Sequence, residues 1–478
     1  MYGVVLSVTG VVFAVWQLLP PANRELSRAR IQVKRRALLQ LSVSLIVVVV
    51  IGQLGATAIG WACPGSGAFT LAIGQAVAVA MMAWMAALAW PTGRWNYDLL
   101  RQFHPRLESL ILNGHSATVT DVLDAALPKA DGEDAVSPID PDSESLVETM
   151  LRDALSHRVF IRSATRHNRQ FMAKVLRRNS WAVVQRVDAI LDELLFGPDP
   201  LLVHELQDTT NYQNGENHRY RIPDRCNILH ALFDDINVAD RLGCWTPIGD
   251  GIREAISQRR GSPSQDPDQR LCVRDWEAGR WDSPVGAGLW FFRVMATSAA
   301  AQDHSSHMWI PYLYHIAQEI VDIVEVPEDE GGTEFPNPYC RWLYDCVECC
   351  SEVIHVVERL DPQSKICIAI QNNDNSAQLI EAALYTYGKC VAIIARSESP
   401  GLRSLRSSCI QSLALDYERW QESTYPEGMS AFAANHLQDR LTDPDRSALA
   451  NQLQALYQHD PHKEVYKDLA QIFMKEGE

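Results

Sequence analysis

The side chains best suited to metal chemistry lie in the C-terminal half of the chain. The candidates are Cys346, Cys349, Cys350, His355, His304 and His307. The three cysteines are spaced i, i+3 and i+4, which places them on one face of a helix. A zinc site commonly adds a second pair of ligands from another segment, and the histidines could supply it. The alternative is that the cysteines pack in a core as small apolar side chains.

Asp303, His304 and His307 also have the chemistry of general acids and bases. No nucleophile accompanies them at a defined spacing, so helix capping or a surface position is the alternative interpretation. The segment Val285–Gly288 lacks the third glycine of a dinucleotide-binding loop, and the sequence contains no glycine-rich phosphate-binding loop. No cofactor is therefore expected.

Basic side chains are concentrated in two segments. The first holds Arg28, Arg30, Lys34, Arg35 and Arg36, and the second holds Arg158, Arg162, Arg166 and Arg169. The spacing of the second group predicts a stripe along one helical face. Such a stripe could contact anionic lipid head groups or grip a phosphorylated ligand. The alternative is that these arginines pair within the molecule, for instance with the acidic segment upstream.

The first fifth of the chain has the composition of a membrane anchor. The 57 residues from Ala37 to Gly93 include no Asp, Glu, Lys, Arg or His. A bilayer core needs about 20 apolar residues per helix. Because Pro and Gly interrupt the stretch near Pro64, it predicts spans over 38–61 and 68–90, and a further apolar run predicts a span over 1–19.

The distribution of arginine and lysine sets the expected orientation of these spans. The loop after the first span is strongly basic, the loop after the second has no charge, and arginines follow the third. Basic loops stay on the cytoplasmic side, so we expect an outer N-terminus, a cytoplasmic C-terminal body and a multi-pass protein of the inner or plasma membrane. A cleaved signal peptide at 1–19 is the alternative, although the charges follow its apolar core instead of preceding it.

Small residues recur every four positions on the predicted spans, with one glutamine in each of the second and third. They are Gly52, Ala56, Gly60, Ala72, Ala76, Ala80, Gln53 and Gln75. Such faces let helices approach closely in lipid, and the two glutamines would lie at similar depth and could bond to each other. The faces could close a self-contained three-helix anchor, or they could join copies of the chain, with a pore as one form of such an assembly. The spans carry no ionisable residue, which disfavours a selective transporter.

Charge divides the chain into unlike parts. Its net charge is −16, yet residues 1–106 carry +7 and the remainder −23. The strong negative charge of the body argues against nucleic acid as a partner. Ten of the eleven cysteines lie in the body without the spacing of a disulfide framework, which is typical of a reducing compartment.

The body is expected to be all-helical. Helical apolar spacing and repeated capping residues before proline, as at Ser283-Pro284, Asn337-Pro338 and Asp361-Pro362, predict many short helices. The expected parts are an anchor over 1–95, a juxtamembrane segment with an acidic linker over 96–145, a helical subdomain over 146–260 and a C-terminal helical domain over 283–478. An α-solenoid is the more specific form of this expectation.

The function expected from these features is non-enzymatic. The body would act as a membrane-anchored tether, sensor or adaptor whose partners are the bilayer and either another protein or further copies of the chain. A more specific version is a bacterial membrane effector that oligomerises through its spans. The alternative is a membrane-tethered hydrolase or metalloenzyme that uses the His/Cys residues of the C-terminal domain.

Overall fold

The computed structural model describes most of the chain beyond the predicted anchor. The described residues are 97–127, 141–178, 180–210, 222–259, 281, 283–306, 309–324, 335, 337–374, 377–399, 402–422, 428–460 and 462–474. All regular structure in these ranges is helical, with no strand, which confirms the predicted all-α body. The three predicted spans, their packing residues and the basic residues between 28 and 36 lie outside them. Among the helices in these ranges, none combines the length and hydrophobicity needed to cross a bilayer.

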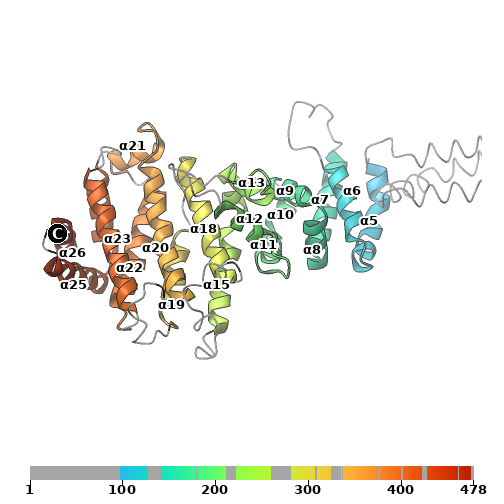
Figure 1. The fold of residues 1–478 in the computed structure, drawn as a ribbon. Helices are drawn as coiled ribbons and strands as arrows, with labels where there is room; N and C mark the ends of the chain where they lie inside the picture. The colour runs from blue at the N-terminus through green and yellow to red at the C-terminus, as the bar shows by residue number, and fades with distance from the viewer. Residues whose placement is uncertain are drawn as a thin grey trace, which may run out of the picture. The chain divides into compact units, whose positions relative to one another are not determined.

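The chain divides into two compact units between Arg186 and Val187. The described helices of the first unit are α5 (Tyr97–Leu112), α6 (Ser116–Ala126), α7 (Pro141–Leu155), α8 (Arg158–His167), α9 (Arg169–Arg177) and α10 (Trp181–Val184). Helix α7 packs against α5 and α10, and α6 packs against α8 (Figure 1). Phe103, Phe160 and Phe171 are fully buried in this unit.

The acidic linker ends earlier than the composition suggests. We expected it to extend to Ser145, but α7 already begins at Pro141. Proline is well tolerated at the first helical position because the N–H group that it lacks would have no partner there. The juxtamembrane segment before the linker forms the two helices α5 and α6.

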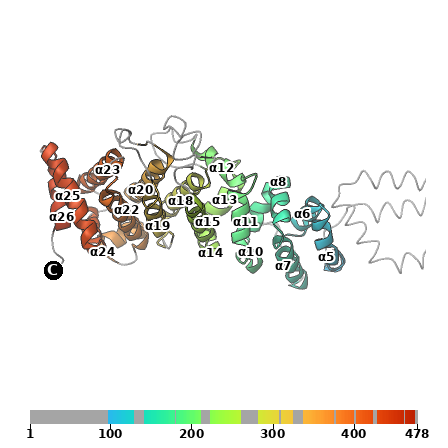
Figure 2. The ribbon, with the colours of Figure 1, turned by 90° about the horizontal axis from the view of Figure 1, so that it is seen from below.

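The second unit contains longer helices. Those described are α11 (Val187–Phe196), α12 (Leu201–Thr210), α13 (Asn227–Phe233), α14 (Ile236–Leu242), α15 (Trp245–Arg259), α18 (Pro284–Ala301), α19 (Pro311–Val321), α20 (Pro338–Val357), α21 (Lys365–Gln371), α22 (Gln378–Arg396), α23 (Arg403–Glu422), α24 (Met429–Arg440), α25 (Asp443–His459) and α26 (Glu464–Met474). Most contacts join helices that are close in sequence; for example, α20 lies between α18 and α22 (Figures 1 and 2).

Helix α22 is the centre of the C-terminal part of this unit. It contacts α19, α20, α23, α24 and α25. Its buried side chains include Leu379, Ala383 and Tyr387, whose helical spacing predicted a buried face. Gly388 allows a close approach, because a Cβ atom there would lie 2.7 Å from Leu437 Cδ2. Most of α22 is therefore covered by neighbouring helices.

Two of the predicted proline-marked helix starts are confirmed. Helices α18 and α20 begin at Pro284 and Pro338, and the Asn337 side chain accepts the N–H of Cys340. The prediction at Asp361-Pro362 is wrong, since α21 begins at Lys365.

The start of α21 is displaced by side-chain capping. Asp361 accepts the N–H of Gln363, which holds the proline between them in a turn. Asp303, in the left-handed region at φ 54°, accepts the N–H groups of Lys365 and Ile366 and so caps the helix from another segment.

Candidate functional site

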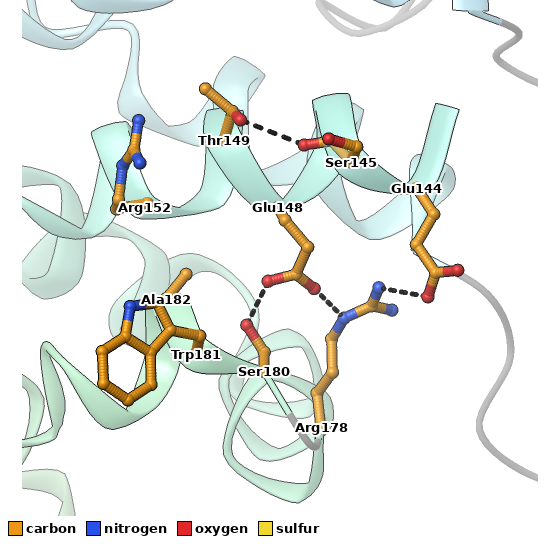
Figure 3. Close-up of a pocket in the computed structure, with 9 residues that line it drawn as sticks. All are labelled: Glu144, Ser145, Glu148, Thr149, Arg152, Arg178, Ser180, Trp181 and Ala182. Carbon is orange, nitrogen blue, oxygen red and sulfur yellow. Dashed lines mark hydrogen bonds and ion pairs between the residues drawn. The ribbon is translucent and has the colours of Figure 1, made fainter. Parts of the chain in front are cut away.

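A groove in the first unit forms between α7 and α10 (Figure 3). We call it the Trp181 groove; its volume is about 710 Å³, and it is lined by Glu144, Ser145, Glu148, Thr149, Arg152, Arg178, Ser180, Trp181 and Ala182. Helix α7 supplies the residues up to Arg152, the segment before α10 supplies Arg178 and Ser180, and α10 itself supplies Trp181 and Ala182. The contact between these two helices fixes both walls.

Much of the charge in the Trp181 groove is paired across it. The Nε atom of Arg178 donates to Glu148 at 2.6 Å, and its Nη2 atom donates to Glu144 at 3.2 Å. The Ser180 hydroxyl donates to the second oxygen of Glu148 (Figure 3). Because these groups bond to one another, they hold the wall in place; the two carboxylates and one guanidinium leave the set with a charge of −1.

Trp181 and Arg152 lie at the other end of the groove in Figure 3. The Trp181 side chain is 72% exposed, the largest exposure among the large apolar residues of the described chain. Arg152 contacts the carboxylate of its neighbour Asp153 at 3.4 Å, which is long for a charge-assisted hydrogen bond. An exposed indole beside an accessible guanidinium suits a ligand that offers an apolar group next to a carboxylate.

A second pocket, in the other unit, surrounds the carboxylate of Asp416. Its volume is about 460 Å³, and it is formed by α20, α22 and α23. The Oδ2 atom of Asp416 accepts the hydroxyl groups of Ser351 and Tyr387, each at 2.7 Å, and its Oδ1 atom lies 3.1 Å from His355 Nε2. Burial by itself would raise the pKa of Asp416, but the bonds from His355, Tyr387 and Ser351 outweigh it and hold the pKa below its ordinary value.

The order of contacts around Asp416 differs from that of a nucleophilic triad. In a triad the imidazole lies between the hydroxyl and the carboxylate and uses one ring nitrogen for each. Here Nε2 of His355 faces both the Ser351 hydroxyl, at 3.3 Å, and Asp416. The serine also donates directly to the carboxylate. The arrangement ties three helices to one buried charge, and the imidazole does not lie between the serine and the carboxylate.

The three cysteines proposed as zinc ligands lie in the core. Cys346, Cys349 and Cys350 are fully buried in α20, and burial raises the pKa of each thiol, so the neutral form is favoured. Across the described ranges, no three His, Cys, Asp or Glu side chains gather closely enough to hold a metal ion. His355, from the same helix, instead contacts Asp416.

The histidines of the earlier segment do not complete a site in the described chain. His304 is part-buried, and its Nε2 atom has no hydrogen-bond partner among the described residues. His307 lies outside the described residues. Asp303 caps α21, as shown above, which is a structural role.

The four arginines of the predicted stripe do not share one helix, so that prediction is wrong. Arg158, Arg162 and Arg166 lie on α8, but Arg169 begins α9. Asn168 separates the helices because its side chain accepts the N–H of Phe171 and caps α9.

Arg166 and Arg162 lie on the side of α8 away from its buried residues, and Arg158 lies at the edge of the buried face. Phe160, Ile161 and Ala164 are fully buried, whereas the neighbouring Val159 is 60% exposed. At 100° per residue, Val159 lies close to Arg166 on the outer face. We call these three arginines and Val159 the α8 face. Contact with an anionic surface stays a prediction for these residues.

Sequence reasoning missed both Trp181 and Asp416. A tryptophan at the start of a short helix has no local signature of exposure, and the partners of Asp416 are 29 to 65 residues away. Comparisons of the chain with protein families, with curated proteins and with solved structures found no match.

Proposed function

We propose that the chain is a membrane-anchored helical adaptor, held by the three predicted spans with its body on the cytoplasmic side. The observation that carries this proposal is that positive charge is concentrated around the predicted spans and negative charge in the second compact unit. Residues 1–186 contain 19 basic and 13 acidic side chains, whereas residues 187–478 contain 24 basic and 46 acidic ones. The positive excess lies in residues 1–106, at +7, whereas residues 107–186 carry −1 and residues 187–478 carry −22.

An anionic leaflet would interact differently with the two units. It attracts basic side chains within about a Debye length and repels acidic ones. The α8 face offers guanidinium groups for head groups and an aliphatic side chain for the interfacial region. The first unit would lie against the membrane, and the second would stay in water.

The second unit has features of a binding module. Its helices pack mainly on helices close to them in sequence, as in an α-solenoid, and such stacks present long surfaces to partner proteins. The described residues give the hydrolase or metalloenzyme alternative little support, since the Ser351 hydroxyl bonds the Asp416 carboxylate directly, outside the order of a triad, and the cysteine thiols are buried. Binding is therefore the function that the geometry supports best.

Protease accessibility in cells tests the anchor and its orientation. The full chain, with an epitope tag at the C-terminus, is expressed in bacteria, and protease is added to spheroplasts before and after permeabilisation. We expect the tag to sediment with membranes after alkaline washing and to be digested only after permeabilisation. A chain released by the alkaline wash, or a tag digested in intact spheroplasts, would overturn the proposal.

A further inference from the structure

We propose that the Trp181 groove docks the first unit on the bilayer, with the indole in the interfacial region and the Arg152 guanidinium on lipid phosphate. This docking rests on the proposed function, because it needs the predicted anchor, and it deepens that function by naming the surface that meets the lipid. The ligand is the phosphodiester layer of the head groups, which zwitterionic and anionic phospholipids share.

Trp181 is the exception among the tryptophans of the described chain. It is 72% exposed, whereas five of the other six are buried and the sixth is half-buried. Exposure of so large an apolar surface forgoes the stabilisation that burial would give. Indoles concentrate at membrane–water interfaces, where the ring is partly removed from water and the N–H group still finds polar partners. An exposed tryptophan in a unit tethered close to a bilayer therefore points to the lipid interface.

The predicted anchor would hold the first unit close to the bilayer. The third predicted span ends at residue 90, and α5, the first described helix, begins at Tyr97. Six residues lie between them in the sequence, and even a fully extended chain spans at most about 3.6 Å per residue. Helix α5 would therefore begin within about 25 Å of the end of the span, which is less than the diameter of a small domain. At such a distance lipid has a high effective concentration, so a weak contact is enough for docking.

The charges of the groove are compatible with any phospholipid surface. Its lining holds two carboxylates and two guanidinium groups, so the formal charges cancel. Arg178 is engaged with Glu144 and Glu148, as Figure 3 shows. Arg152 contacts one described side chain, that of Asp153, at 3.4 Å. A guanidinium group can bond two oxygens of a phosphodiester, so Arg152 has the chemistry to bind the phosphate layer.

One orientation of the first unit serves both side chains. Trp181 and Arg152 lie at the same end of the groove (Figure 3). At a bilayer surface the indole would lie at the boundary of the acyl chains, and the longer arginine side chain would reach the phosphates beside it. The bonds among Arg178, Glu148 and Ser180 would remain as they are, so docking needs no rearrangement of the groove wall.

Photocrosslinking in lipid nanodiscs tests the contact. The full chain carries p-benzoylphenylalanine in place of Trp181 and is reconstituted into discs of phosphatidylcholine, with or without phosphatidylglycerol. We expect lipid adducts of the peptide that contains position 181, in equal yield from both kinds of disc, because the charges of the lining cancel. As a control, the same amino acid in place of Leu415, an exposed apolar residue of the second unit, should give no lipid adduct.

Three outcomes would overturn the inference while leaving the anchor intact. Adducts to a protein segment, from the same or a second copy, would show that protein fills the groove. Adducts that need phosphatidylglycerol would show that basic side chains elsewhere, such as those of the α8 face, dock the unit. A chain retained in the discs without any adduct would show that the groove stays in water. A chain that is not retained would refute the proposed anchor, and the docking with it.

Charge reversal at Arg152 gives an independent measurement. In the chain with p-benzoylphenylalanine at position 181, Arg152→Glu should lower the initial rate of lipid adduct formation about tenfold, because a hydrogen bond to a charged group contributes about that factor. Arg152→Lys keeps a cation that reaches phosphate and should retain most of the rate. The matched control Arg440→Glu reverses an exposed arginine of the second unit and should leave the rate unchanged. An unchanged rate in Arg152→Glu, or an equal loss in Arg152→Lys, would overturn the proposed contact with phosphate.

Discussion

The buried carboxylate of Asp416 predicts a large local loss of stability for Asp416→Ala. In the wild-type chain the carboxylate accepts hydrogen bonds from Ser351 and Tyr387 and faces His355, so it joins α23 to α20 and α22. Truncation leaves the Tyr387 hydroxyl, in a side chain that is fully buried, without its acceptor. Breaking a buried charged contact of this kind typically costs about 3–5 kcal/mol.

The loss of stability in the related variants should depend on which hydrogen-bonding atoms each variant retains. Asp416→Asn retains an oxygen for the two hydroxyl donors and can donate to a neutral His355, so it loses mainly the charge and should cost about 1–2 kcal/mol. Tyr387→Phe removes one donor and should cost about 1–3 kcal/mol, because the bond is to a charged group. The exposed control Asp439→Asn should stay within about 0.5 kcal/mol of wild type.

Hydrogen exchange, followed by mass spectrometry on the full chain in detergent, measures this loss of stability in individual helices. A loss of about 3–5 kcal/mol corresponds to exchange faster by about two to four orders of magnitude in peptides from α20, α22 and α23. Peptides from the first unit should be unchanged in the same sample. An Asp416→Ala variant with wild-type exchange in α20 and α23 would refute the reasoning that this carboxylate ties the helices together.

The pH dependence of this contribution has a definite sign. The pKa of Asp416 is lower in the folded chain than its ordinary value of about 3.9, so the ionised form stabilises the fold. This stabilisation is complete above the ordinary pKa and is lost as the pH falls through the lower folded pKa. The difference in exchange between wild type and Asp416→Asn should therefore shrink as the pH falls below about 4.

Three further variants or treatments test the packing of the second unit. Lys389→Met removes one of the two cations that bond Asp445 and should destabilise the chain by about 1–3 kcal/mol, because Arg396 still pairs with that carboxylate; a lowered thermal midpoint measures the loss. Gly388→Ala places a Cβ atom 2.7 Å from Leu437 and should cost about 1–3 kcal/mol in the same assay. The thiols of α20 should not react with iodoacetamide at pH 8 in the folded chain but should react after denaturation, because burial holds them protonated; labelling read by mass spectrometry in the native state would contradict this.

The helical character of the body could be predicted because it depends on local spacing. The apolar residues of α20 and α22 recur at helical intervals, and this periodicity is enough to identify the buried face of each helix. Proline after a capping residue located the starts of α18 and α20 to the residue. It failed at α21, where Asp303, from a distant segment, caps a later position.

Capping also changed the interpretation of the basic segment. Spacing predicted one stripe through Arg169, because intervals of three and four residues fit a continuous helix. Asn168 ends that helix and caps the next, so the last arginine lies on α9. Asparagine is favoured at such N-cap positions, so Asn168 was itself a signal for the start of a new helix. The spacing of the arginines alone does not show whether the first helix ends there or continues.

The sequence by itself determined the helical class of the described body, the buried faces of its principal helices and the division between basic and acidic parts, because composition and periodicity are local properties. Only the tertiary structure decided which polar groups meet. Asp416 is joined to its partners across 29 to 65 residues, and Trp181 is exposed because no described segment of its unit covers it. Contacts of this kind depend on how the helices pack against one another, and the local pattern of residue types does not show which distant residues that packing brings together.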